Sequence, residues 1–382
     1  MSASDAISSD DLKGFLRKLL GSPLDDKDTA PRRLRNQDYQ SISDYLQMAG
    51  KRSWADRPRT FTVLYMIDHV EAMDGFIAED LSDIALPYSD GNLPNVFSKQ
   101  ARSQFLRYQS NVLDEVAADI AGDLEEGGQH RNLDGPAETY FRRVRRLGEG
   151  GFATVDEVVG NLSSKHFALK RMPRHTFFET DRSRLEAVKN ELQSLKRLSH
   201  KHIVQLVGSF TDHEGIGLLM TPVAKQNLAE FMTARVDKDG QEDRRFLLRN
   251  FFGCIASAVD YLHSQNIRHK DIKPQNILVK DTKVYITDFG TSRMWIKDDT
   301  DTTEGTVSAF TQRYSAPEVI HSQKRNKSAD IWSLGCVFLE MAVVLADRTL
   351  RDMKTFFLTN GSKREFVYSN PEALSLWIEE LR

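Results

Sequence analysis

The sequence predicts an α+β fold, because strand-like and helical patterns both occur after residue 138. Strand-like residues alternate on both sides of the glycine-rich run 147–155, which is typical of a hairpin. One amphipathic helical run follows at 183–198. Farther on, both cysteines lie in helical apolar contexts, and a small helical region is expected before residue 138.

Composition limits the classes of protein that fit. The chain has 382 residues, of which 40% are hydrophobic and 28% charged, which is enough for two or three domains with cores of their own. A net charge of -3 argues against a dedicated nucleic-acid binder. Cys254 and Cys336 indicate reduced, buried thiols, and with a polar, acidic N-terminus they predict an intracellular protein, cytoplasmic or nuclear. The apolar stretch Ile331–Ala346 is short and contains Glu340, so we expect no membrane span.

Residues 1–137 are predicted to form a helical N-terminal region with linkers, and 138–382 a second domain. After the capping candidates Ser9 and Asp10, apolar residues recur at helix spacing up to Leu20. Amphipathic patterns follow at 60–70 and 101–120, and the glycine-rich, acidic segment 121–138 is expected to be a tether. No motif here carries chemistry. We expect a cap packed on the strands, with partner binding or autoinhibition as the functional alternative.

The chemistry is concentrated in two motifs. Asp288-Phe289-Gly290 lies 17 positions after Asp271, which belongs to the segment 269–276, HKDIKPQN. Asp271, Asn276 and Asp288 then supply a carboxylate base and two oxygen ligands for magnesium, the groups that phosphoryl transfer needs. An ordinary polar turn is the alternative, but it does not account for both motifs in this order and at this distance.

Two upstream features fit phosphate binding. The run Leu147–Val155 reads LGEGGFATV, and glycines 148, 150 and 151 let backbone amides approach phosphate oxygens. Lys170 ends a strand-like segment, and Glu191 in the helical run is the carboxylate expected to hold it. Glu186 competes for that role, but Glu191 shares the inward face of Leu195. By itself a glycine-rich turn is more often structural, and a Lys–Glu pair is more often a solvated surface pair.

Together these residues resemble the eukaryotic protein kinase family over roughly residues 138–345. The resemblance implies the bilobal protein-kinase fold, with a lobe of antiparallel strands and one helix from about Tyr140 to Met220 and a mostly helical lobe from about Leu228 onward. It implies ATP as substrate and Mg²⁺ as cofactor. It also implies that Asp271 takes the proton of the substrate hydroxyl and that Lys273 neutralises the transferred group. Asn276 and Asp288 would bind the metal.

The same resemblance implies an adenine pocket and a hinge. Its residues would be Leu147, Val155, Ala168, Met220, Val223 and Leu278. For each apolar residue taken singly, core packing is the alternative. Leu195, Leu206, His269 and Phe289 resemble the stacked internal spine of such enzymes. The run 330–335, DIWSLG, resembles the buried helix whose aspartate, here Asp330, anchors the catalytic loop.

Lys273 and Thr311 resemble the serine/threonine branch, in which the threonine bridges Asp271 and Lys273. The ending Ala316-Pro317-Glu318 favours a protein hydroxyl as acceptor over a small molecule. The N-terminal pattern, including Trp54–Arg59, is similar to N-terminal regions of kinases from filamentous fungi.

Two departures from the family pattern stand out. Lys270 replaces the usual arginine, which weakens any control by a phosphorylated activation segment. Only 52 residues follow Asp330, so the C-lobe is expected to be shortened, and Glu318 has no evident partner. Within this stretch, the apolar positions of 371–378 suit a helix of the C-lobe. The alternative function is therefore a nucleotide-binding scaffold with little or no turnover.

Overall fold

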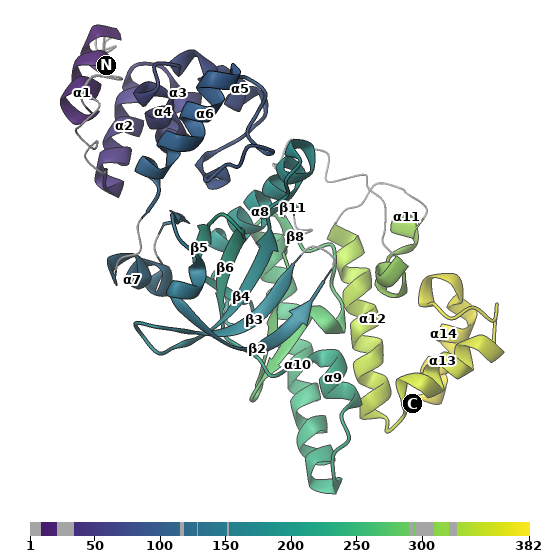
Figure 1. Cartoon of the computed structure of the whole chain (residues 1–382). Coiled ribbons are helices and arrows are strands. Elements are labelled where there is room, and N and C mark those ends of the chain that lie inside the picture. The colour runs from purple at the N-terminus through teal and green to yellow at the C-terminus, as the bar shows by residue number, and fades with distance from the viewer. Residues whose placement is uncertain are drawn as a thin grey trace, which may run out of the picture. The chain divides into compact units, whose positions relative to one another are not determined.

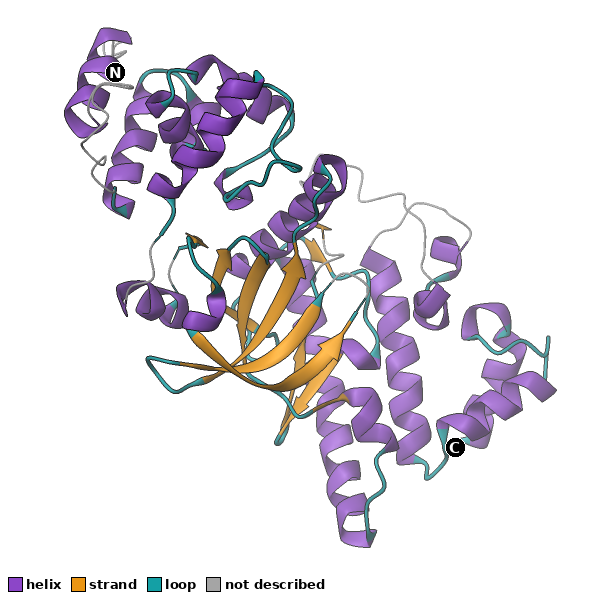
Figure 2. Ribbon diagram, viewed as in Figure 1, coloured by secondary structure: helices purple, strands orange, loops and turns teal. Residues whose placement is uncertain are grey.

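The computed structural model describes residues 9–20, 34–114, 118–127, 129–150, 153–289, 293–294, 309–320 and 327–382 (Figure 1). The chain divides into two compact units. The first comprises Met1–Lys189 and Leu206–Met220, and the second Asn190–Gln205 and Thr221–Arg382. The first unit contains both helices and the strands of the large sheet, and the second is mainly helical with a few short strands. Figure 2 shows helices and strands in different colours.

The N-terminal part of the first unit is helical. Its α-helices are α1 (Ser9–Leu20), α2 (Asn36–Met48), α3 (Arg52–Ala55), α4 (Pro58–Met66), α5 (Met73–Ala78), α6 (Lys99–Tyr108) and α7 (Ala118–Glu126), and its 3-10 turns are η1 (Val70–Ala72), η2 (Asp83–Ala85) and η3 (Gln109–Val112). The predicted first helix is confirmed as α1. An aromatic cluster forms the core, in which Phe76 contacts Tyr88, Phe97 and Phe105 with ring centroids 5.6–5.9 Å apart.

The prediction of one helix across 101–120 is wrong. Helix α6 ends at Tyr108, and the chain continues through η3 to an extended Asp114 that bridges to Leu133. The side chain of Gln109 accounts for the break, because it donates to the carbonyl oxygen of Tyr88 and accepts from its N–H, both at 2.8 Å. These two hydrogen bonds hold the chain against another segment instead of continuing the helix.

The expected tether at 121–138 is also wrong in part. It contains most of α7, the short strand β1 (Arg131–Asn132) and the 3-10 turn η4 (Ala137–Thr139). Strand β1 pairs in parallel with β5 (Gln205–Thr211), with Arg131 opposite Phe210 and Asn132 opposite Thr211. A glycine-rich, acidic composition does not predict a two-residue strand that is stabilised by a distant partner.

A six-stranded sheet follows, in the order β1-β5-β6-β4-β3-β2. The remaining strands are β2 (Phe141–Glu149), β3 (Thr154–Gly160), β4 (His166–Pro173) and β6 (Gly215–Thr221), and helix α8 (Phe178–Arg197) follows β4. The pairs β2–β3, β3–β4 and β4–β6 are antiparallel, as the alternation predicted. The core of this sheet includes Leu133, Phe141, Leu169, Phe210 and Leu219, all buried.

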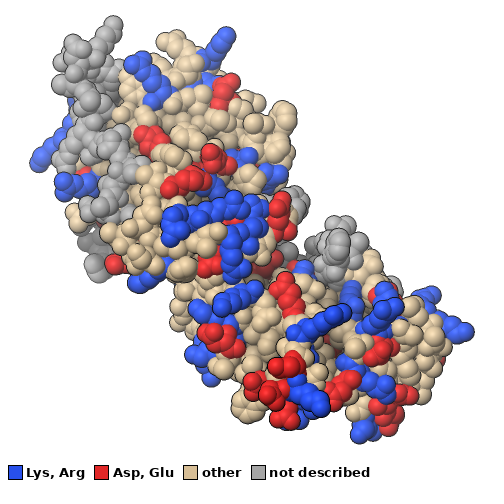
Figure 3. Space-filling model, turned by 60° about the horizontal axis from the view of Figure 1, so that its bottom comes forward, with Lys and Arg blue, Asp and Glu red and all other residues tan. Residues whose placement is uncertain are grey.

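Strand β2 is an edge strand that carries exposed arginines. Arg143 and Arg146 pair with Asp156 of β3 at 3.0 and 2.7 Å, and Arg145 pairs with Glu157 at 2.8 Å. Three of the four arginines of this strand therefore have an acidic partner on the neighbouring strand. On the face of the molecule drawn in Figure 3, basic and acidic side chains are interspersed.

The second unit is mainly helical. Its helices are α9 (Leu228–Thr233), α10 (Lys238–Ser264), α11 (Pro317–Ile320), α12 (Lys327–Leu345), α13 (Leu350–Thr359) and α14 (Pro371–Glu380), and its 3-10 turns are η5 (Pro274–Asn276), η6 (Ala309–Tyr314) and η7 (Val367–Ser369). Its short strands are β7 (Gln226–Asn227), β8 (Ile267–Arg268), β9 (Ile277–Lys280), β10 (Lys283–Ile286) and β11 (Arg293–Met294). The predicted helical pattern near residue 371 is confirmed as α14, where Ala373 and Trp377 pack with Val343, Met353 and Phe357.

Helix α12 is long and apolar enough to cross a membrane by length and composition alone. It also carries two buried acidic residues, Asp330 and Glu340, which contact side chains or backbone of neighbouring segments. We therefore describe α12 as a core helix of the second unit.

Candidate active site

The loop between β8 and β9 holds Asp271 in a fixed orientation. The Nζ of Lys273 donates to Oδ2 of Asp271 at 2.7 Å, and Nδ2 of Asn276 donates to the same oxygen at 2.9 Å. Asn276 also donates to the backbone carbonyl oxygen of Asp271 at 2.9 Å. The structure thus brings together three residues that the sequence predicted as one site.

The other carboxylate oxygen of Asp271 is buried, and it has no hydrogen-bond partner among the residues that the structure describes. A buried acceptor without a partner is costly unless a ligand completes it. The side chain of Thr311, which was expected to bridge Asp271 and Lys273, lies outside the described residues. Within the described part of the chain, Oδ1 is therefore the oxygen open to a donor such as a hydroxyl group.

Asp330 of α12 anchors this loop. Its carboxylate, on a residue only 2% exposed, accepts from the backbone N–H of His269 at 2.9 Å and of Lys270 at 2.8 Å. Nε2 of His263 in α10 donates to it at 3.0 Å. Burial pushes the pKa of Asp330 up, but the His263 hydrogen bond, nearby His269 and the two N–H donors lower the pKa overall. Lys270 has φ 67°, a left-handed conformation that these bonds help to hold.

The same loop is tied to the segment that carries Asp288. His269 donates from Nε2 to the carbonyl oxygen of Thr287 at 2.9 Å. Its ring packs edge-to-face with that of Phe289, with the ring centroids 5.0 Å apart. Thr287 N–H donates to the carbonyl oxygen of Asn276 at 3.0 Å. Asp288 itself is exposed and has φ 67°. A strained backbone at this residue is consistent with an aimed side chain.

The glycine-rich hairpin and Lys170 belong to the first unit. Gly148 of β2 lies opposite Val155 of β3, and the turn is closed by a hydrogen bond from Gly150 N–H to the carbonyl oxygen of Ala153 at 2.9 Å. Val155 in turn lies opposite Lys170 of β4. Gly151, the third predicted glycine, lies outside the described residues.

Packing against the described residues does not explain these glycines. Among those residues, a Cβ at Gly148 would meet no atom within 4 Å, and one at Gly150 would meet the carbonyl oxygen of Ala153 at 3.8 Å. Neither residue has the left-handed φ that favours glycine. An open space beside backbone amides is what a phosphate group would fill.

The predicted adenine-pocket residues fall into both units. Ala168 of β4 lies opposite Met220 of β6, both buried, and the half-buried Leu147 is in β2. Val223 and Leu278 are half-buried residues of the second unit, and Leu278 lies in β9 opposite Tyr285. Glu191, only 2% exposed, lies in the part of α8 that belongs to the second unit. The role of each in binding adenine or Lys170 stays a prediction.

The sequence did not predict a cluster of Arg313, Tyr314 and Glu340, which links α12 to the segment just before Ala316-Pro317-Glu318. Glu340 of α12 is buried and accepts from Arg313 Nε at 2.8 Å and from Tyr314 OH at 3.1 Å. Burial raises the pKa of Glu340, against the opposing effect of Arg313. Glu318 is only half-buried, and the described residues include no ion-pair partner for it.

The family is identified by sequence comparison. The sequence profile described as "Protein kinase domain" matches residues 141–355, which is more than half of the chain. The chain therefore belongs to the protein kinase domain family, and its β-sheet unit and helical unit agree with the α+β bilobal fold of that family.

The curated relatives carry the names of protein kinases, and one of the following three is named a serine/threonine-protein kinase. The chain is 29% identical to cAMP-dependent protein kinase type 3 of Saccharomyces cerevisiae over 62% of its own length and 56% of the relative's. It is 30% identical to 3-phosphoinositide-dependent protein kinase 1 of Rattus norvegicus, over 55% and 36% respectively. Serine/threonine-protein kinase PLK2 of Mus musculus is 30% identical, over 61% and 33%. The matched part thus spans about half or less of these relatives. A filamentous-fungal type and a shortened C-lobe stay predictions.

Proposed function

We propose that this protein is an ATP- and Mg²⁺-dependent kinase that transfers the γ-phosphoryl group to serine or threonine hydroxyls of proteins. The observation that carries the proposal is Asp271: Lys273 and Asn276 bind one of its carboxylate oxygens, and the other is buried without a partner among the described residues. A base oxygen that lacks a donor among the described residues suits a substrate hydroxyl. A protein that only bound nucleotide would not need it.

Each remaining residue has a role that its chemistry supports. Backbone amides near Gly148 and Gly150 would approach phosphate oxygens, and Lys170, held by Glu191, would bind the α and β phosphates. Lys273, already beside Asp271, would neutralise charge on the transferred group.

Asn276 and Asp288 provide the kind of oxygen ligands that Mg²⁺ prefers. Because the Nδ2 of Asn276 is committed to Asp271, its amide oxygen is the atom left to coordinate a metal. Among the described residues, no cluster of three or more His, Cys, Asp or Glu side chains could hold a metal. That finding fits an ion bound by one or two protein groups together with phosphates. Bound magnesium would neutralise charge on the phosphates.

The test is transfer of labelled phosphate from ATP, with magnesium, to a generic protein substrate and to the chain itself. Asp271→Asn should reduce incorporation by about 10²–10⁴-fold, because the substrate proton loses its acceptor. ATP should still raise the melting temperature of this variant, since phosphate binding does not use Asp271. Phosphoamino-acid analysis should find phosphoserine or phosphothreonine.

Asp281→Asn is the matched control. Asp281 is exposed in the turn between β9 and β10 and has φ 53°, which asparagine also tolerates. Equal incorporation by the wild type, Asp271→Asn and Asp288→Asn would contradict the proposal. Stabilisation by ATP without transfer in any form would favour the scaffold function instead.

A further inference from the structure

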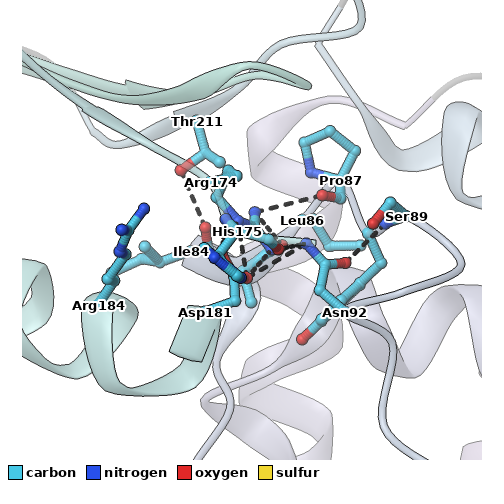
Figure 4. A network of polar contacts seen from close by, with 12 residues as sticks. Ile84, Leu86, Pro87, Ser89, Asn92, Arg174, His175, Asp181, Arg184 and Thr211 are labelled. Carbon is cyan, nitrogen blue, oxygen red and sulfur yellow. Dashed lines mark hydrogen bonds and ion pairs between the residues drawn. The ribbon is translucent and has the colours of Figure 1, made fainter. Parts of the chain in front are cut away.

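The start of helix α8 contains a buried carboxylate that faces the N-terminal helical region (Figure 4). Asp181 is 1% exposed and lies in the first turn of α8. Arg174, which follows β4, binds it through Nη2 at 2.7 Å and Nε at 2.9 Å, and the N–H of His175 donates at 2.7 Å. A carboxylate with these donors at a helix N-terminus is well stabilised.

The segment 79–92 of the N-terminal helical region completes this network. Asn92 Nδ2 donates to Asp181 at 3.2 Å. Arg174 Nη1 donates to the carbonyl oxygens of Ala85 at 2.7 Å and Pro87 at 3.3 Å. The same guanidinium therefore binds α8 and segment 79–92, and Figure 4 shows it between the two.

The contact continues along α8. Arg182 pairs with Glu79, and Lys189 Nζ pairs with Asp80 at 2.7 Å. Between them Leu185 is buried beside a cavity of about 210 Å³. The described residues that line this cavity belong to this part of α8, to segment 79–92 and to Ala78. Two turns of α8, from Asp181 to Lys189, are thus in contact with the segment.

Segment 79–92 is itself fixed to the edge of the sheet. Thr211 of β5 donates to the carbonyl oxygen of Ile84 at 2.9 Å. Asn132 of β1 donates from Nδ2 to the carbonyl oxygens of Asp83 at 2.7 Å and Leu86 at 2.8 Å. A segment held on one side by the sheet and on the other by α8 determines where the helix lies against the sheet.

The consequence for the site follows from the helix itself. Glu191 lies ten residues after Asp181 in α8, which at about 1.5 Å per residue is roughly 15 Å along one rigid element. We propose that segment 79–92 positions α8, and through it Glu191, with Asp181, Arg182 and Lys189 as positioning residues. The N-terminal helical region then contributes to phosphoryl transfer by holding α8 in place. The inference rests on the proposed function, in which Glu191 holds Lys170.

The test uses charge reversal at the partly exposed pair Glu79–Arg182. Arg182→Glu and Glu79→Arg each convert an ion pair into like-charge repulsion, so each should lower kcat by about threefold. Hydrogen exchange of the α8 amides should become faster in both. The double variant Glu79→Arg/Arg182→Glu should restore most of kcat and of the exchange protection, short of the wild-type values, because Arg182 also pairs with Glu179 at 3.2 Å and that second ion pair stays lost. Loss of kcat in Glu79→Arg is the sharper result, because Glu79 lies outside the matched kinase region.

Arg197→Glu is the control, because Arg197 is an exposed arginine of the same helix. Arg197→Glu should leave kcat unchanged, and its urea midpoint should match that of Arg182→Glu. A lower kcat in Arg182→Glu at the same urea midpoint would then result from displacement of α8 and not from a general loss of stability. Unchanged kcat and unchanged exchange in both single variants, or no rescue in the double variant, would overturn the inference. If the wild type transfers no phosphate, the proposed function fails, and α8 exchange alone decides whether segment 79–92 positions the helix.

Discussion

Asp330 lies about 60 residues after the loop that it holds, and it accepts hydrogen bonds from two backbone N–H groups and one histidine of the second unit. The sequence identified Asp330 by resemblance to a family motif. His263 was missed because nothing in its neighbourhood, the last turn of a long helix, distinguishes it from a surface histidine. Asn92, Arg174 and Asp181 were missed for the same reason, since long-range polar partners leave no local pattern.

Asp330→Asn should lower the free energy of unfolding by about 2–3 kcal/mol, because the loop donors lose a charged acceptor. Urea unfolding measures the change. Phosphate transfer should also fall, since the loop orients Asp271. Asp281→Asn is again the control, and equal stability of the two variants would contradict the anchoring role of Asp330.

Cys336 should be inert to alkylation in the folded protein. Burial, with the nearby Glu340, raises the pKa of its thiol to about 12, so only about 10⁻⁴ is thiolate at pH 8. Cys254 is half-buried and should react first. Iodoacetamide labelling followed by mass spectrometry distinguishes the two, and urea should make their rates alike. Equal labelling in the native state would be inconsistent with the packing around α12.

Periodic patterns in the sequence predicted strands β2 to β4 and helices α1, α8 and α14. The predictions of secondary structure were wrong at α6, which ends early because Gln109 binds the backbone of Tyr88, and at β1, which was expected to be part of a tether. Both depend on segments distant in sequence, so tertiary contacts override the local pattern. In the site, the family resemblance grouped Asp271, Lys273 and Asn276, and the structure brings them together because they occupy one short loop.

Strand β1 makes a testable contribution to the sheet. Asn132→Ala should lower the free energy of unfolding by about 1–3 kcal/mol, because the carbonyl groups of Asp83 and Leu86 lose their shared donor. Thermal or urea unfolding gives the value. Asn190→Ala, at an exposed position of α8, is the comparison and should change stability far less. A similar small effect at both sites would mean that β1 adds little.

For the whole molecule, His200 and His202 predict a loss of stability in mild acid. Burial, then neighbouring cationic groups, lower the pKa of both histidines below the usual value of about 6.5. The unfolded chain therefore takes up protons first, and stability is lost as pH falls from about 6.5 through the folded pKa values.

The melting temperature should thus fall between pH 7.5 and 5.5 at constant ionic strength. In the double variant His200→Gln/His202→Gln, the melting temperature should fall less over the same pH range. His213→Gln, at an exposed site, should keep the wild-type slope. If the melting temperature of the double variant fell with pH as steeply as that of the wild type, other groups would be responsible for the acid sensitivity.

Segment 79–92 is synthesised well before the residues that hold it in place. Ile84 accepts its hydrogen bond from Thr211, a residue 127 positions later in the chain. At about 5–20 residues per second, a ribosome would need roughly 6–25 s to synthesise the intervening residues. During that interval the nascent N-terminal helices exist without the strand and helix that complete their contacts, so docking of this region is a late event in biosynthesis.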